Sequence, residues 1–159
     1  MNILAAVVAG IAGTAAISLL MAMGPKMGLP KMAIWEILGA MFDPRGNHAL
    51  GWTAHFMMGI VFAIVYTALW SAGIGAPTPV WGVVFGALHF VVVGLMTLAP
   101  ARSAGVGGMP LMHAGIKAGT VKAPGVLMLN QGVMGLMGGL VGHILYGLVV
   151  ALIVAAFPA

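Results

Sequence analysis

Long apolar runs alternate with short polar stretches along the whole chain. Four runs are long enough to cross roughly 30 Å of hydrocarbon at about 1.5 Å per helical residue, and they cover residues 3–23, 49–70, 79–98 and 133–157. Backbone groups in lipid must form hydrogen bonds within their own segment, so each run is predicted to be an α-helix. No basic stretch precedes the first run, which favours a retained span over a cleaved signal. The pattern predicts an all-α, polytopic membrane protein with four transmembrane helices in one domain, residues 1–159.

The basic residues predict how the chain crosses the membrane. They fall in two connections, between the first and second runs and between the third and fourth: Lys26, Lys31, Arg45, Arg102, Lys117 and Lys122. The connection at 71–79 has none. Lys and Arg favour the cytoplasmic side, so both long connections are expected in the cytoplasm and both termini outside. Trp70 and Trp81 flank the short outer loop, as interfacial aromatic residues do.

Both cytoplasmic connections carry apolar patterns of their own. In the first, apolar residues recur at helical spacing between Lys31 and Asp43, at Ile34, Ile37, Leu38 and Met41. This spacing predicts one interfacial helix after span one, with a plain loop under the bundle as the alternative. The second connection, 101–131, is glycine-rich and apolar. A structureless loop of that length is unusual, so we expect it to pack on the bundle, re-enter the membrane or meet a partner.

The second and fourth runs share a sequence pattern. Residues 51–69 and 139–157 align so that Gly51, His55, Gly59, Val61, Ala63 and Ala68 match Gly139, His143, Gly147, Val149, Ala151 and Ala156. The two halves, about 1–72 and 73–159, would have the same orientation in the membrane. The match predicts a parallel two-helix duplication whose pseudo-twofold axis follows the membrane normal.

Small residues flank both aligned histidines at four-residue spacing. They are Gly51, Gly59 and Ala63 around His55, and Gly139, Gly147 and Ala151 around His143. Residues four apart form one ridge along a helix, and small residues let another backbone or a flat ligand come close. We expect these six to be helix-packing residues and both histidines to face the bundle interior at one depth. His89, on the third run, is expected nearer the middle of the membrane.

Three interpretations of the histidines remain open. In one, His55 and His143 face each other and, with His89 as a further candidate, bind haem, a chlorophyll-type pigment or a metal. In another, they hydrogen-bond between helices, to a backbone carbonyl or to one of four side chains, Thr53, Tyr66, Thr67 and Tyr146. In the third, they line a path for protons or a solute, since ionisable residues inside membranes are functional candidates.

Composition narrows the possible functions further. Of 159 residues, 62% are hydrophobic and 5% are charged, whereas soluble domains carry roughly 25% charged residues. The bilayer is therefore the expected partner of the surface. Six basic residues against two acids are too few for a nucleic-acid patch. The chain has no cysteine, so disulfides and thiolate metal sites are excluded.

The sequence carries no signature of an enzyme. Its only carboxylates are Glu36 and Asp43, both in one connection, so no carboxylate pair is available within the spans for acid–base chemistry. The 14 methionines are scattered, as adaptable packing residues are, and form no dedicated metal site. We therefore expect a protein without catalytic residues.

Three stretches together carry a resemblance to a known group of proteins. MGLPKM (27–32), GWTAHFMMGIVFAIVYTALW (51–70) and GLVGHILYG (139–147) are similar to segments of a family of small, four-span bacterial membrane proteins of unknown function. The resemblance covers most of the chain. It implies a location in the bacterial inner (cytoplasmic) membrane and supplies no functional residues.

Three functional classes fit these observations. The leading one is an accessory subunit that packs against other membrane proteins, for example in a respiratory or photosynthetic complex, or against copies of itself. The second is an electron-transfer protein that binds haem, a pigment or a metal through His55 and His143. The third is a small transporter or channel.

Overall fold

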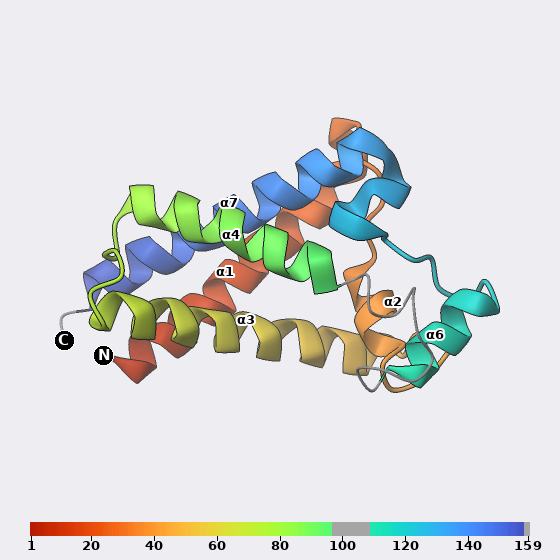
Figure 1. Ribbon diagram of the computed structural model, residues 1–159, viewed down its shortest axis with the longest axis horizontal. Helices are drawn as coiled ribbons and strands as arrows, with labels where there is room; N and C mark the ends of the chain where they lie inside the picture. The colour runs from red at the N-terminus through yellow and green to blue at the C-terminus, as the bar shows by residue number, and fades with distance from the viewer. Residues whose placement is uncertain (97–108, 158–159) are drawn as a thin grey trace.

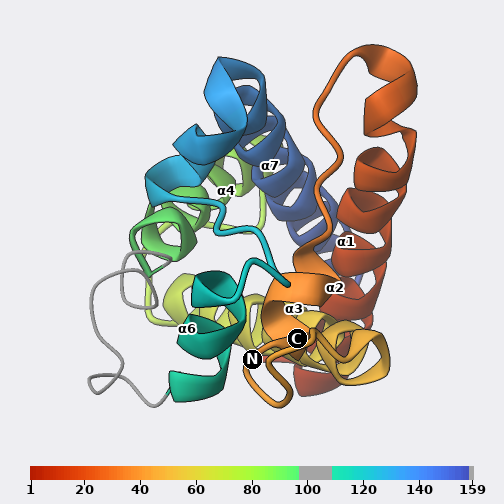
Figure 2. The same cartoon turned by 90° about the vertical axis from the view of Figure 1, so that its right-hand side faces the viewer.

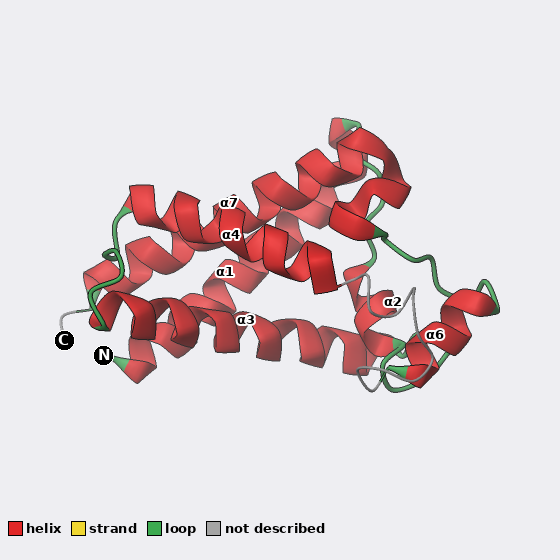
Figure 3. Ribbon diagram, in the orientation of Figure 1, coloured by secondary structure: helices red, strands yellow, loops and turns green. Residues whose placement is uncertain are grey.

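The computed structural model describes residues 1–96 and 109–157, and within these ranges it contains helices and connections but no strands (Figures 1 and 3). In chain order the helices are α1 (Ile3–Met23), the 3-10 helix η1 (Gly24–Met27), α2 (Ile34–Gly39), α3 (His48–Ser71), α4 (Pro79–Met96), α6 (Pro110–Lys117), the 3-10 helix η2 (Val126–Gln131) and α7 (Gly132–Ala156). The predicted all-α fold is confirmed.

Four of these helices, α1, α3, α4 and α7, are long and apolar enough to span a membrane. Their ends lie within one residue of the predicted runs wherever the structure describes them; the predicted end of the third run at residue 98 lies outside the described residues. Asparagine side chains cap the N-termini of α1 and α3. Asn2 Oδ1 accepts a hydrogen bond from the Ala5 amide at 3.0 Å, and Asn47 Oδ1 accepts one from the Leu50 amide at 3.1 Å.

The chain termini lie together at one end of the bundle (Figure 1). We call this the terminal end; it also holds the loop between α3 and α4. The opposite end, called the connection end, holds α2 and α6 (Figure 2). The described basic residues, Lys26, Lys31, Arg45, Lys117 and Lys122, all belong to segments at the connection end.

Glycines let the helices of each half cross closely. Between α1 and α3, a Cβ on Gly10 would lie 2.6 Å from Ile60 Cα, and one on Gly59 would fall on the Thr14 side chain. Between α4 and α7, a Cβ on Gly82 would lie 2.7 Å from the Gly147 carbonyl oxygen. Gly59 and Gly147 occupy aligned positions in the predicted repeat, so equivalent glycines lie at the crossing of each pair.

Aromatic side chains close the terminal end. Tyr66, Trp70, Phe85 and Tyr146 pack with Val150 in a buried cluster, where the Trp70 and Phe85 rings stack with centroids 5.5 Å apart. The Tyr66 hydroxyl donates to the Phe85 carbonyl at 2.8 Å. The Tyr146 hydroxyl donates to the carbonyl of Gly59 on α3. These two hydrogen bonds connect the first half of the chain to the second in both directions.

The helix expected after span one is present as α2, which ends at Gly39, before Met41. It lies against α3, where the Trp35 ring stacks on Trp52 with centroids 4.7 Å apart and Gly51 faces the Trp35 carbonyl. Part of the apolar face predicted for this helix is covered by other residues of the protein, since Ile37 is buried among Ala40, Met112 and Val121.

The second connection is not a structureless loop where the structure describes it. Within 109–131, α6 packs beside the α2–α3 turn, with Gly115 against the Pro44 carbonyl and the Thr120 hydroxyl donating to that same carbonyl at 2.7 Å. Of the three expectations for this connection, packing on the bundle describes these residues. Residues 101–108 of the predicted connection lie outside the described ranges.

Candidate functional site

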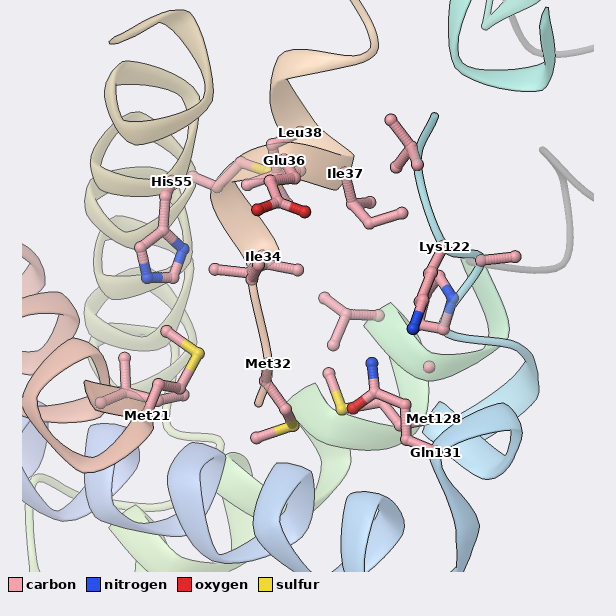
Figure 4. A pocket seen from close by; sticks show the side chains of 18 of the residues that line it. Met21, Met32, Ile34, Glu36, Ile37, Leu38, His55, Lys122, Met128 and Gln131 are labelled. Atoms are coloured by element: carbon pink, nitrogen blue, oxygen red, sulfur yellow. The ribbon is translucent and has the colours of Figure 1, made fainter. Parts of the chain in front are cut away.

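A cavity of about 970 Å³ lies between the long helices toward the connection end (Figure 4). Side chains from α1, α2, α3, α4, η2 and α7 line it. Most of its wall is apolar and includes Ile17, Met21, Met32, Met58, Phe62 and Phe90. Its residues nearest the terminal end, such as Thr14 and Tyr146, adjoin the packed aromatic cluster.

Two irregular segments form part of the cavity wall. At Gly28 the backbone takes the left-handed conformation (φ +81°), which ends η1 and lets the chain return in an extended segment toward α2. In η2, Leu127 and Met128 also have positive φ (+49° and +62°), which is unusual for residues with side chains. Figure 4 shows Met128 and Gln131 of this segment facing the cavity. Strained backbone of this kind is found most often at functional sites.

All three membrane histidines line this one cavity. His89 is buried, with 8% of its surface exposed, and its ring stacks on Phe62 with centroids 3.7 Å apart. The His143 ring meets the His89 ring edge to face at 4.8 Å. His55 points into the cavity from α3 (Figure 4) and contacts the Trp52 ring at 5.9 Å.

The structure pairs the histidines differently from the sequence repeat. One of the three interpretations has His55 and His143 facing each other, whereas the described ring contacts join His143 to His89 and to Phe90. The repeat placed His55 and His143 at equivalent positions but contained no information on how far apart α3 and α7 lie. His89, which the repeat leaves out, is the histidine in contact with His143.

Hydrogen bonds from these histidines do not join helices in the described part of the chain. His143 Nδ1 is 2.7 Å from the Gly139 carbonyl oxygen of its own helix. The side chains expected to receive a histidine bond have other partners: Thr53 and Thr67 donate within α3, and both tyrosines donate to backbone carbonyls. The helices are therefore held by glycine contacts and tyrosine bonds.

Several buried polar atoms of the cavity have no hydrogen-bond partner. Within the described residues, four buried side-chain atoms are unpartnered: His55 Nε2, Trp70 Nε1, His89 Nδ1 and Gln131 Oε1. Three of the four belong to residues that line the cavity. Buried polar atoms are nearly always hydrogen-bonded, and an exception calls for an explanation such as a bound water, ion or ligand. A few unpartnered polar atoms in a mostly apolar cavity are typical of a binding site for a ligand that has polar groups.

Three of the described lining residues carry charged side chains. They are Lys31, Glu36 and Lys122. Figure 4 shows Glu36 and Lys122 turned toward the cavity from opposite walls. Glu36 Oε1 also lies 3.8 Å from His48 Nε2. The described lining therefore combines a few charged side chains with a mostly apolar wall.

The histidine geometry does not favour a haem between His89 and His143. An axial haem needs two imidazole nitrogens on opposite sides of the iron, each with a metal–nitrogen bond of about 2 Å. The two rings are instead in direct edge-to-face contact, which leaves no room for a macrocycle between them. The described residues contain no group of three or more His, Cys, Asp or Glu side chains able to hold a metal ion.

The six predicted helix-packing residues are buried at helix contacts but do not share one partner. Gly51 faces α2 and Gly59 faces α1, while Gly147 faces α4. Gly139 lies against Phe90 and Met128, where a Cβ would be 2.7 Å from the Met128 sulfur. Ala63 and Ala151 are fully buried.

Sequence analysis did not identify Gln131, Phe62 or Met128 as site residues. One signal was available for Gln131: it is the single glutamine of the chain and directly precedes the fourth span. Phe62 could be recognised only once the structure placed its ring against His89 of α4. No protein-family model, curated protein or solved structure matches this chain.

Proposed function

We propose that this protein is a non-catalytic, multi-pass protein of the bacterial inner membrane that binds one amphipathic ligand in the cavity between its helices. The observation that carries the proposal is the set of unpartnered atoms on His55, His89 and Gln131, which converge on one largely apolar cavity. A ligand with a few polar groups and an apolar body would satisfy these atoms and fill the remaining space.

The size and position of the cavity support this function. Ligand sites generally occupy roughly 300–1,000 Å³ and lie between helices in bundles, and this cavity has about 970 Å³. The cavity lies toward the end that carries the described basic residues. The positive-inside rule therefore orients its mouth toward the cytoplasm and both termini outward.

Binding is better supported than transport. A transport path must reach both sides of the membrane, whereas Tyr66, Trp70 and Phe85 fill the bundle at the terminal end. A ligand that enters from the connection end would meet this cluster and stop. A pigment bound by one of the histidines remains within the proposal as one kind of ligand.

A pair of neighbouring methionines on α3 provides the test. Met58 lines the cavity, whereas Met57 faces outward and is 58% exposed. Met58→Trp should fill part of the cavity, and Met57→Trp should add the same side chain outside it. Protein purified in mild detergent would be extracted with organic solvent, and its extract examined by mass spectrometry and visible absorption.

The expected result is one compound in stoichiometric amount from the wild type and Met57→Trp, and at least tenfold less from Met58→Trp. The proposal is wrong if no compound co-purifies and added apolar compounds bind the wild type and Met58→Trp equally. Equal thermal stability of the two variants would show that the bundle itself is intact.

A second function, packing as an accessory subunit, is favoured by the exposure of α3. Only 22% of an apolar 18-residue stretch of this helix is buried, against 33–39% of the corresponding stretches of the other three long helices. Its outer face carries Met57, Val61 and Val65, all exposed. Native gel electrophoresis of solubilised membranes tests this role, since migration only as a free monomer contradicts it. Ligand binding and subunit packing use different faces of α3 and are compatible.

A further inference from the structure

We infer that the ligand of the cavity is a lipid-soluble quinone or quinol: a neutral, flat ring with oxygen groups on more than one edge and an apolar tail. The inference rests on the proposed ligand-binding function and specifies its chemistry. It follows from three properties of the cavity, which are the small number of charged residues in its described lining, the placement of its polar atoms and the shape of its walls.

The interior of the cavity favours an uncharged ligand. Among the described lining residues only Lys31, Glu36 and Lys122 are charged, and none of them belongs to α4, which carries His89. A phosphate or carboxylate placed beside His89 would therefore find no basic side chain on that described wall of a low-dielectric site, which is costly. The deep part of the ligand is therefore neutral.

The unpartnered atoms require polar groups on more than one edge of the ligand. His55 belongs to α3, His89 to α4, and Gln131 to the segment before α7, so the atoms approach from different walls. A neutral imidazole nitrogen donates or accepts according to its tautomer, and a glutamine amide offers both kinds of group. Such a set accommodates a carbonyl in the oxidised ligand and a hydroxyl in the reduced one.

The walls of the cavity suit a flat ring with a flexible tail. The ring of His89 is already stacked on Phe62, and Phe90 lies against the His143 ring, so flat surfaces border the polar atoms. Thioethers of Met21, Met32 and Met128 line the rest, and methionine adapts its shape to aromatic and aliphatic partners. A volume of about 970 Å³ exceeds what a ring alone requires.

The experiment tests the chemical class of the ligand separately from the existence of the binding site. The neutral dye N-phenyl-1-naphthylamine would be bound to purified protein, with Met58→Trp and Met57→Trp as the variants that define cavity binding. Ubiquinone-1, ubiquinol-1 and oleate would then be titrated as competitors. His89→Phe retains the flat ring on Phe62 but removes its nitrogens, and Gln131→Met removes the amide at similar length. His48→Phe, on α3 outside the cavity, is the matched control.

We expect both quinone forms to displace the dye and oleate to compete at least tenfold more weakly. His89→Phe and Gln131→Met should each weaken ubiquinone-1 about tenfold, the effect of one lost hydrogen bond, while dye binding and His48→Phe stay at the wild-type level. If the dye binds in the cavity but oleate displaces it better, or if His89→Phe leaves quinone affinity unchanged, the quinone assignment is overturned and the binding function stands. If Met58→Trp does not reduce dye binding, the binding function itself fails.

Discussion

The same four helices pack tightly at the terminal end of the bundle and enclose a cavity toward the connection end. At the terminal end, Tyr66, Trp70 and Phe85 fill the space between α3, α4 and α7. Toward the connection end, α3 contacts α2 through Gly51 and Trp35, and the cavity separates it from α4 and α7. A ridge of small residues therefore does not produce uniform packing along a helix, because its members meet different neighbours.

Two glycines on α7 give the largest expected difference between the ends. A Cβ on Gly147 would collide with the Gly82 carbonyl and lie 3.0 Å from Gly86 Cα, where backbone cannot yield. A Cβ on Gly138 would meet only Met32 Cε at 3.4 Å and Leu29 side-chain carbons at 3.5 Å or more. Gly147→Ala should lower the free energy of unfolding by about 2–3 kcal/mol. Gly138→Ala should leave it unchanged or raise it by up to ~1 kcal/mol through helix propensity.

Unfolding in mixed detergent–SDS micelles, followed by circular dichroism, measures both alanine variants. Equal losses of stability would mean that α7 packs as closely toward the connection end as at the glycine crossing. That result would contradict the contrast between the two ends.

Two valines test the contrast with a smaller change. Val150 is fully buried in the aromatic cluster, whereas Val93 is half-buried at the cavity wall. Val150→Ala leaves a void among packed side chains and should cost roughly 1–2 kcal/mol. Val93→Ala only enlarges a space that already exists, so its cost should be at most about half as large. The same micelle unfolding assay applies, and a greater loss for Val93→Ala would contradict the open cavity.

The smallest expected effect lies at the surface of the connection end. The Arg45 side chain donates hydrogen bonds at 3.2 Å to the Asp43 carboxylate, and the Arg45 backbone amide donates another at 3.0 Å. These hydrogen bonds hold the pKa of the Asp43 carboxyl below its usual value of 3.8. The ionised carboxyl therefore adds stability above its unfolded pKa, and this is lost as the pH falls through the lower folded pKa.

Asp43→Asn should accordingly lower the unfolding temperature slightly at neutral pH, and the difference from wild type should shrink as the pH falls below 3.8. Thermal unfolding from about pH 3 to pH 7 measures this. A difference that persists unchanged at the acid limit would show that the variant acts through packing instead of charge.

The sequence was sufficient for the helices but not for their arrangement. The long apolar runs are bordered by polar or turn-forming residues, such as Asn2 and Asn47, so the described ends of the spans could be predicted to within a residue. Interhelical distances depend on which glycine meets which backbone, and four-residue spacing on one helix does not specify the partner. That is why the sequence repeat relates His143 to His55, whereas the histidine ring in contact with His143 is that of His89.

The cavity could not be predicted for a related reason. Part of its wall comes from Met128, whose positive φ is not expected for a methionine in an apolar run. Another part comes from the extended segment after Gly28, whose return toward α2 is a tertiary feature. The three candidate histidines line this cavity, but the glutamine and aromatic residues that complete the lining depend on packing between helices.

The two tyrosine hydrogen bonds also bear on how the chain could have arisen. Tyr66 of the first half donates to the second at Phe85, and Tyr146 of the second half donates to the first at Gly59. The halves thus hold each other as two subunits of a dimer would, while the loop between Ser71 and Pro79 only keeps them on one chain. In assembly terms each half is a helical hairpin that bonds to the other, and we expect two pieces of the chain, split within that loop, to retain their mutual interface.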